Sequence, residues 1–299
     1  MKEKEAVHVR AISITLKDKI QDLELLVKFR LSTFVVFSSV IAYCIAAGSN
    51  FHIIPFLLLA SGGFLITFSA NILNEILEAE YDRMMERTAN RPLAAGRWST
   101  SSAVVLAGIT SLLGIMFLAL LNPLTSFLGT ISLVTYAFLY TPLKRYSTIS
   151  VIVGAIPGAL PVMIGMIAYD GVITPAALFL FAIQFIWQFP HFWSIGFLSF
   201  NQYQRAGYKL LPEESGAVDK RLGMQALIYA FLLMPVLGIG YVAGLISLFG
   251  LMGMILISGY FIFKAWSFQM RFDKESARAL MFSSFIFLPV SLMILWWSM

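Results

Sequence analysis

Residues 54–92 read IPFLLLASGGFLITFSANILNEILEAEYDRMMERTANRP, an apolar run that continues directly into a charged segment. The apolar run, residues 54–70, is typical of a helix that crosses a bilayer. In the charged segment, Asn74, Glu78 and Asp82 are spaced four residues apart. Each such step rotates a helical side chain by only about 40° beyond a full turn, so the three oxygen-bearing side chains share one face. We therefore expect a membrane helix that ends in a polar stripe.

The polar stripe has the chemistry of a magnesium site. Two carboxylates and an amide at intervals of about 6 Å supply the hard oxygen ligands that Mg²⁺ takes in small number, with water and substrate phosphate completing its shell. Arg87 and Arg91 follow and could bind the same phosphates through paired hydrogen bonds. The alternative is a solvated, salt-bridged helix end just outside a membrane. The unbroken stripe beside a bilayer, and the N-R-P-L after it, favour the functional interpretation.

The composition indicates a membrane protein. The chain has 299 residues, of which 59% are hydrophobic and 12% charged, and its mean hydropathy is +0.82. A soluble domain of this size carries about twice as much charge. The lone cysteine, Cys44, excludes an intramolecular disulfide and a cysteine-based metal site. In such a chain the net charge of +5 reflects orientation in the membrane, and we expect no nucleic-acid partner.

The fold class follows from the number of apolar segments that approach the length of about 20 residues needed to cross a bilayer. The expected spans are 31–48, 54–74, 102–121, 124–142, 149–168, 174–194, 224–244, 247–265 and 279–298. We therefore predict an all-α, polytopic membrane protein with nine transmembrane helices in one bundle. Residues 1–30 form a separate polar segment, with an amphipathic interfacial helix over 7–26, and residues 31–299 form the transmembrane domain.

The orientation of the bundle follows from its charges. If the nine spans hold, one set of loops, together with the span ends that adjoin them, carries all 21 Lys and Arg residues, and the opposite loops carry none. The same side holds every one of the 16 acidic residues except Asp170. By the positive-inside rule this side and the N-terminus are cytoplasmic, and the C-terminus lies outside. We therefore expect the active site at the cytoplasmic mouth of the bundle.

Two further stretches carry candidate functional residues. One reads Tyr140-Thr-Pro-Leu-Lys-Arg145, and its basic pair is either a snorkelling anchor at a helix end or, beside an anionic substrate, a clamp. The other begins Trp187-Gln-Phe-Pro-His-Phe-Trp193 and places His191 inside a span, where an ionisable side chain is a functional candidate. His191 could ligate a metal centre, move a proton, or bond a backbone carbonyl of a helix broken by proline.

These motifs together resemble those of a known family. The N-x-x-x-[DE]-x-x-x-D pattern from Asn74 to Asp82 resembles the UbiA-type intramembrane prenyltransferases. The haem-modifying branch of that superfamily is similar in three further stretches: Arg87-Thr-Ala-Asn-Arg-Pro-Leu93, Tyr140 to Arg145, and Trp187-Gln-Phe-Pro-His-Phe192 continuing to Tyr203-Gln-Arg-Ala-Gly-Tyr-Lys-Leu-Leu-Pro212. The resemblance covers nearly the whole chain. The chain departs from the family pattern at Glu78, where Asp is common, at Asn201 and Gln202, where an acid is expected, and at Lys28-Phe29-Arg30, where members often read K-P-R.

The resemblance implies transfer of a farnesyl group from farnesyl diphosphate to a vinyl group of haem B. It assigns Mg²⁺ to Asn74, Glu78 and Asp82, and places His191 at the haem iron or in proton and water chemistry. The substrate-binding residues that it implies are Arg87, Arg91, Lys144, Arg145, Tyr140, Tyr203 and Arg205, with Lys28 or Arg30 for the haem propionates. It also implies a bacterial inner membrane and, as protein partners, a haem A synthase or oxidase assembly factors.

Two other functions compete with this reading. One is a prenyltransferase of the same architecture that acts on an aromatic acid or a quinol precursor. The other is a small transporter or a non-catalytic assembly subunit. A transporter would carry charges at the centres of its spans and polar loops on both sides, whereas these spans are almost free of charge and the outer loops are nearly so.

Overall fold

Long apolar helices make up most of residues 15–299, the part of the chain that the computed structural model describes. The elements are α1 (Leu16–Leu26), α2 (Phe29–Ala47), α3 (Ile53–Asp82), α4 (Thr100–Ala119), α5 (Pro123–Val134), the π-helix η1 (Thr135–Tyr140), α6 (Thr141–Leu143), α7 (Ser150–Asp170), α8 (Pro175–Leu198), α9 (Phe200–Arg205), β1 (Glu213–Glu214), β2 (Ala217–Val218), α10 (Arg221–Phe231), α11 (Leu233–Val242), α12 (Leu248–Arg271) and α13 (Lys274–Ser298).

The predicted membrane bundle is confirmed. Within residues 15–299, nine helical segments are long and apolar enough to cross a bilayer, and they correspond one to one with the predicted spans. The division between the seventh and eighth spans, which the sequence marks only by Gly244, falls between α11 and α12, where Gly244 has a φ of +70°. The seventh span is itself interrupted at Leu232, because Pro235 cannot donate a hydrogen bond to the carbonyl four residues earlier.

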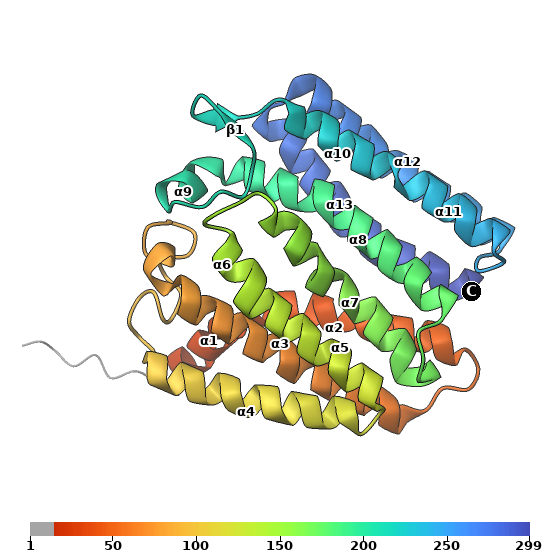
Figure 1. Ribbon diagram of the computed structural model, residues 1–299, viewed down its shortest axis with the longest axis horizontal. Helices are drawn as coiled ribbons and strands as arrows, with labels where there is room; N and C mark the ends of the chain where they lie inside the picture. The colour runs from red at the N-terminus through yellow and green to blue at the C-terminus, as the bar shows by residue number, and fades with distance from the viewer. Residues whose placement is uncertain (1–14) are drawn as a thin grey trace, which may run out of the picture.

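The connecting segments separate into two ends of the bundle, as Figure 1 shows. The segment 83–99, α6, α9 and the β1–β2 hairpin gather at one end, at the left of the view, and the C-terminus lies at the other. The first end holds the loops that carry the basic residues, so the fold brings the motifs of the sequence to one mouth.

Helix α3 places the polar stripe at this mouth. Its 30 residues correspond to about 45 Å at the rise of an α-helix, against a hydrocarbon core of about 30 Å. One continuous helix therefore crosses the apolar layer and carries Asn74, Glu78 and Asp82 on its last turns. The fourth span reaches the same end through η1, and π-helical turns of this kind frequently accompany functional sites.

Helix α1 lies beside segment 83–99. It begins at the N-cap Thr15, whose side chain forms a capping box with Asp18, and Asp22 binds Arg97 at 2.8 Å. Leu16 and Ile20 are exposed on its outer face, as an interfacial helix requires. Val7 and Ile12, which also belong to the predicted helix over 7–26, lie outside the described residues.

Glycines in α7 allow the central helices to approach closely. A Cβ atom at Gly165 would lie 2.0 Å from the carbonyl oxygen of Ser39 in α2, and one at Gly158 would lie 1.9 Å from Oε1 of Gln188 in α8. Such small residues permit helix contacts inside a membrane that larger side chains would prevent. The glycines of α7 therefore serve close packing of the helices.

We predict that Gly165→Ala separates α2 from α7 and destabilises the protein by about 1–3 kcal/mol, the usual cost of overpacking. Thermal unfolding in detergent measures this effect. Gly259→Ala in α12 is the matched control, because nothing lies within 4 Å of its added Cβ. Equal midpoints for the two variants would show that the close contact at Gly165 is not needed.

Candidate active site

The polar stripe of α3 is buried. The side chains of Asn74, Glu78 and Asp82 belong to residues that are at most 4% exposed. Burying an ionised carboxylate without a partner is costly, so each one requires a cation or several hydrogen bonds. The stripe is therefore not the solvated helix end that was the alternative interpretation of the sequence.

Three cations from three different segments meet this stripe. Lys28, which precedes α2, donates from Nζ to Oδ1 of Asn74 at 2.5 Å. Lys144, which follows α6, donates to Oε1 of Glu78 at 2.7 Å. Arg91 donates to Oδ2 of Asp82 at 2.7 Å, and its Nη1 also lies 4.0 Å from Oε2 of Glu78.

The charge states of these cations differ. Burial opposes the charge of both Lys144 and Arg91, but Glu78 raises the pKa of Lys144 well above its usual value, and Asp82 raises the pKa of Arg91. For Lys28, burial and the nearby Arg91 lower the pKa to about 7, although Glu78 acts in the opposite direction. Lys28 is therefore the cation of the cluster that exchanges a proton near neutral pH.

A second layer of hydrogen bonds holds the stripe in place. Nδ2 of Asn74 donates to Oγ1 of Thr141 at 2.9 Å, and that hydroxyl donates to the carbonyl of Tyr136 in η1. Glu75, which is fully buried, accepts a hydrogen bond from the backbone N–H of Leu93. These bonds fix Asn74 against the fourth span and fix the turn that carries Arg91.

Sequence reasoning did not select Glu75 or Thr141. Glu75 lies about 100° around α3 from Asn74, so the four-residue spacing that identified the stripe passes over it. Thr141 lies in the stretch from Tyr140 to Arg145, but only the basic residues of that stretch suggested a function. Both residues act through contacts with segments distant in the sequence.

Several buried polar atoms at this mouth have no hydrogen-bonding partner among the described residues. They are Oδ1 of Asp82, Oε2 of Glu75 and Nε of Arg145. An unpaired buried polar atom costs about 1–3 kcal/mol, so a cluster of them indicates a ligand. The free oxygen of Asp82 lies on the helix face that Asp82 shares with Asn74 and Glu78, and these three side chains carry hard oxygen donors of the kind that suits Mg²⁺.

The described residues do not form a complete metal-binding site here. Within 15–299, no group of three or more His, Cys, Asp or Glu side chains converges as a metal site. The donor set that fits Mg²⁺ includes an amide, and its two carboxylates contact Arg91 and Lys144.

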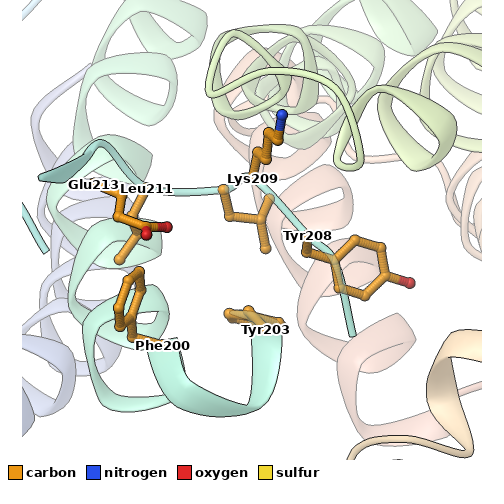
Figure 2. A pocket seen from close by; sticks show the side chains of 7 residues that line it. Phe200, Tyr203, Tyr208, Lys209, Leu211 and Glu213 are labelled. Atoms are coloured by element: carbon orange, nitrogen blue, oxygen red, sulfur yellow. The ribbon is translucent and has the colours of Figure 1, made fainter. Parts of the chain in front are cut away.

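The loop after α9 covers one side of the cluster. Tyr208 packs on Tyr81 of α3 with ring centroids 5.7 Å apart, and the backbone N–H of Lys209 donates to the carbonyl of Lys144 at 2.7 Å. A pocket of about 240 Å³ opens here, lined by Phe200, Tyr203, Tyr208, Lys209, Leu210, Leu211 and Glu213. Figure 2 shows the rings of Phe200 and Tyr203, from α9, facing the chain of residues 208–213.

The remaining predicted residues divide into two groups. Arg87 donates to the hydroxyl of Tyr203 at 3.2 Å, Lys144 lies 4.5 Å from the Tyr140 ring centroid, and Arg145 donates to the carbonyl of Leu77. These residues surround the cluster. Arg30 and Arg205 are exposed outside it.

His191 occupies a different place, between α8 and α13. It is 9% exposed, and its Nδ1 lies 2.7 Å from Oγ of Ser284. Its ring stacks on Trp187 with centroids 5.0 Å apart. His191 is thus fixed by α13 and has no hydrogen bond to the stripe of α3 among the described residues.

Together the fold and this cluster define a class of protein, a helical membrane bundle with a cluster of charged residues at one mouth. Residues 35–286 match the UbiA prenyltransferase family. The chain therefore belongs to the UbiA family and is a prenyltransferase, as the motifs of the sequence predict.

The chain is similar to several known proteins in sequence and in structure. The chain is 39% identical over 266 residues to a protoheme IX farnesyltransferase from Cytophaga hutchinsonii, covering 89% of this chain and 93% of that protein. Its fold resembles a digeranylgeranylglyceryl phosphate synthase, with a TM-score of 0.78 at 18% identity over 93% of this chain and 98% of the other. It also resembles a UbiA homologue from Archaeoglobus fulgidus bound to GPP and Mg²⁺, with a TM-score of 0.66 at 13% identity over 92% and 99% of the two chains.

We predict that Thr141→Val lowers stability by about 1–3 kcal/mol, because Nδ2 of Asn74 then lacks its acceptor. The same substitution should lower activity by releasing the Asn74 amide. Thr130→Val is the matched control, since the Thr130 hydroxyl bonds only the carbonyl of Ser126 in its own helix. Thermal unfolding and turnover measure both effects, and a Thr141 variant as stable and active as the Thr130 variant would contradict the prediction.

Proposed function

We propose that this prenyltransferase transfers a farnesyl group from farnesyl diphosphate to a vinyl group of haem B, giving haem O for the haem-copper oxidases. The observation that carries the choice of acceptor is the similarity, over nearly the full length, to a protein named protoheme IX farnesyltransferase. The observation that supports the diphosphate is the half-buried group of cations around the α3 stripe.

The residues of the stripe would hold Mg²⁺. Asn74, Glu78 and Asp82 are its ligands in this proposal, and Oδ1 of Asp82, which has no hydrogen-bonding partner in the described part of the chain, supports that role. When bound, the ion neutralises negative charge that develops on the diphosphate as it leaves. The UbiA homologue seen with GPP and Mg²⁺ supports the same pairing of substrate and metal.

The cations of the cluster prepare the leaving group. Arg91 and Lys144 contact carboxylates in the described structure, and a diphosphate entering the mouth would offer them stronger anionic partners. Lys28 becomes fully charged as the diphosphate arrives, because an anion favours its protonated form. Arg87, which is bonded to Tyr203, lies at the outer edge of the mouth. Arg145 lies over the ring of Tyr81 in α3.

Farnesyl transfer breaks one bond of the donor and forms one carbon–carbon bond to the acceptor. The bond between farnesyl C1 and the diphosphate oxygen breaks, and its electron pair leaves with the diphosphate. The haem vinyl group supplies the electron pair of the new carbon–carbon bond. Water adds to the cation that forms on the vinyl side and loses a proton, which leaves a hydroxyethylfarnesyl arm. The proposal requires that water stay away from the farnesyl cation until the vinyl group reacts. The ring of Tyr140, whose centroid lies 4.5 Å from Nζ of Lys144, can stabilise positive charge.

Haem contacts are assigned to residues outside the cluster. His191 contacts the haem iron or guides the proton and water chemistry, as the resemblance implies. Arg30 is exposed near the same mouth and suits a propionate. Lys28, the other propionate candidate, is better suited to the diphosphate because its Nζ contacts Asn74. Arg205, exposed after Tyr203, is the further candidate for an anionic group.

The protein crosses the membrane several times, and we place it in a bacterial inner membrane with the charged mouth and N-terminus in the cytoplasm and the C-terminus outside. A haem A synthase or oxidase assembly factors would be its protein partners there. A product as apolar as a farnesylated haem needs a membrane-bound acceptor.

The enzyme in purified membranes, given haem B and radiolabelled farnesyl diphosphate, should form a product with the mass of haem B plus a hydroxyfarnesyl unit. EDTA should abolish this product and added Mg²⁺ should restore it. Asp82→Asn should require more Mg²⁺ than the parent, whereas Asp170→Asn at the opposite end should not. Farnesylation of 4-hydroxybenzoate instead of haem B, or full activity in EDTA, would contradict the proposal.

The pKa of Lys28, about 7, predicts a pH dependence of substrate affinity. Above pH 7 the free enzyme holds Lys28 neutral, so binding must take up a proton and the affinity for farnesyl diphosphate falls as the pH rises. The limiting slope is about tenfold per pH unit for one proton. The KM for farnesyl diphosphate should therefore rise more steeply between pH 7 and 9 in the parent than in Lys28→Met, with Lys17→Met as the control. Equal slopes in parent and Lys28→Met would contradict it.

A further inference from the structure

His191 is held by one residue of another helix. Its Nδ1 lies 2.7 Å from Oγ of Ser284, which belongs to α13, and both residues are buried. Among residues 15–299, the imidazole ring makes no other hydrogen bond. A neutral imidazole carries its proton on one nitrogen only, so this contact decides which nitrogen keeps a lone pair.

The direction of the hydrogen bond follows from the other partner of Ser284. Its Oγ also lies 2.5 Å from the carbonyl oxygen of Met281. A carbonyl oxygen can only accept, and a hydroxyl has one proton to donate. The Ser284 proton therefore goes to Met281, and Oγ is left to accept from Nδ1–H of His191. With the proton on Nε2 instead, one of these two short contacts would join two acceptors.

Ser284 also controls the plane of the imidazole ring. Its backbone carbonyl accepts from Nε1 of Trp187 at 3.1 Å. The Trp187 indole stacks on the His191 imidazole with an interplanar angle of 16°. The Phe285 ring also contacts the imidazole, with 5.2 Å between the two centroids. One residue of α13 thus fixes both the tautomer and, through Trp187, the orientation of His191.

We infer that Ser284 is a positioning residue that keeps His191 in the Nδ1–H form, with the lone pair on Nε2. This inference rests on the proposed function for its catalytic meaning. A lone pair on Nε2 allows the ring to accept a proton from water or to bind iron, and does not allow it to donate a hydrogen bond from that nitrogen. His191 therefore acts as a base or a ligand toward the haem acceptor, not as an acid.

The tautomer can be measured without turnover. The chain has three histidines, so a His8→Gln, His52→Gln protein labelled with ¹⁵N-histidine reports His191 alone. Nitrogen shifts distinguish a protonated ring nitrogen from one with a lone pair. We expect protonated Nδ1 and unprotonated Nε2 in the substrate-free protein. Protonated Nε2, in a neutral or a charged ring, would overturn the inference.

Variants of Ser284 test the cause. Ser284→Ala should give a mixture of the two tautomers, and Ser284→Thr, which keeps the hydroxyl, should restore the Nδ1–H form. Ser283→Ala is the matched control, because the Ser283 hydroxyl is equally buried and bonds only the carbonyl of Leu280. An unchanged spectrum in Ser284→Ala would overturn the assignment to Ser284.

Activity then tests the consequence. Ser284→Ala should lower kcat by about tenfold to a hundredfold, the usual effect of losing a residue that orients a functional histidine. Its KM for farnesyl diphosphate should stay near that of the parent, because α13 contributes no hydrogen bond to the α3 cluster within the described residues. An unchanged kcat would overturn the positioning role. Absence of any haem product from the parent would instead refute the proposed function, and the nitrogen shifts would still decide the tautomer.

Discussion

The burial of two carboxylates on the last turns of α3 is the constraint on which the rest of the site depends. A membrane helix that ends in buried Glu78 and Asp82 is stable only if cations reach them. Those cations come from the loop after α6 and from the segment between α3 and α4, while Lys28 reaches the neighbouring amide from the start of α2. The charged cluster therefore ties three connections of the bundle together at one mouth. Under the proposed function, the residues that hold the bundle together at this mouth are also those that bind the substrate.

If the proposed function holds, this pairing also explains how a highly charged diphosphate binds inside a largely apolar protein. Arg91 and Lys144 are held in position, and kept cationic, by the carboxylates that they contact. A diphosphate with its metal ion brings both negative and positive charge, so it can exchange partners with the cluster without leaving an isolated charge buried. Among residues 15–299, Oδ1 of Asp82 and Nε of Arg145 have no hydrogen-bonding partner, so the proposed exchange can use both atoms.

Features that depend on one helix could be predicted from the sequence, and features that depend on contacts between helices could not. The period of α3 defines the face shared by Asn74, Glu78 and Asp82, and apolar length defines the nine spans, even where Gly244 alone separates two of them. The partner of Asn74 is Lys28, 46 residues away, and the partner of His191 is Ser284, 93 residues away. Periodicity says which way a side chain faces but not which helix it meets. The π-helical turn before Thr141 had no signal in the sequence pattern.

A structure of the enzyme with Mg²⁺ and farnesyl thiodiphosphate, a slowly reacting analogue, tests the central claim most directly. The phosphates and the ion should lie between the α3 stripe and the loops that carry Arg91 and Lys144. Both cations should have turned from their carboxylates toward the phosphate oxygens. Phosphates bound at the opposite end, near residues 171–174, or an intact Arg91–Asp82 bond with the analogue bound elsewhere, would contradict it.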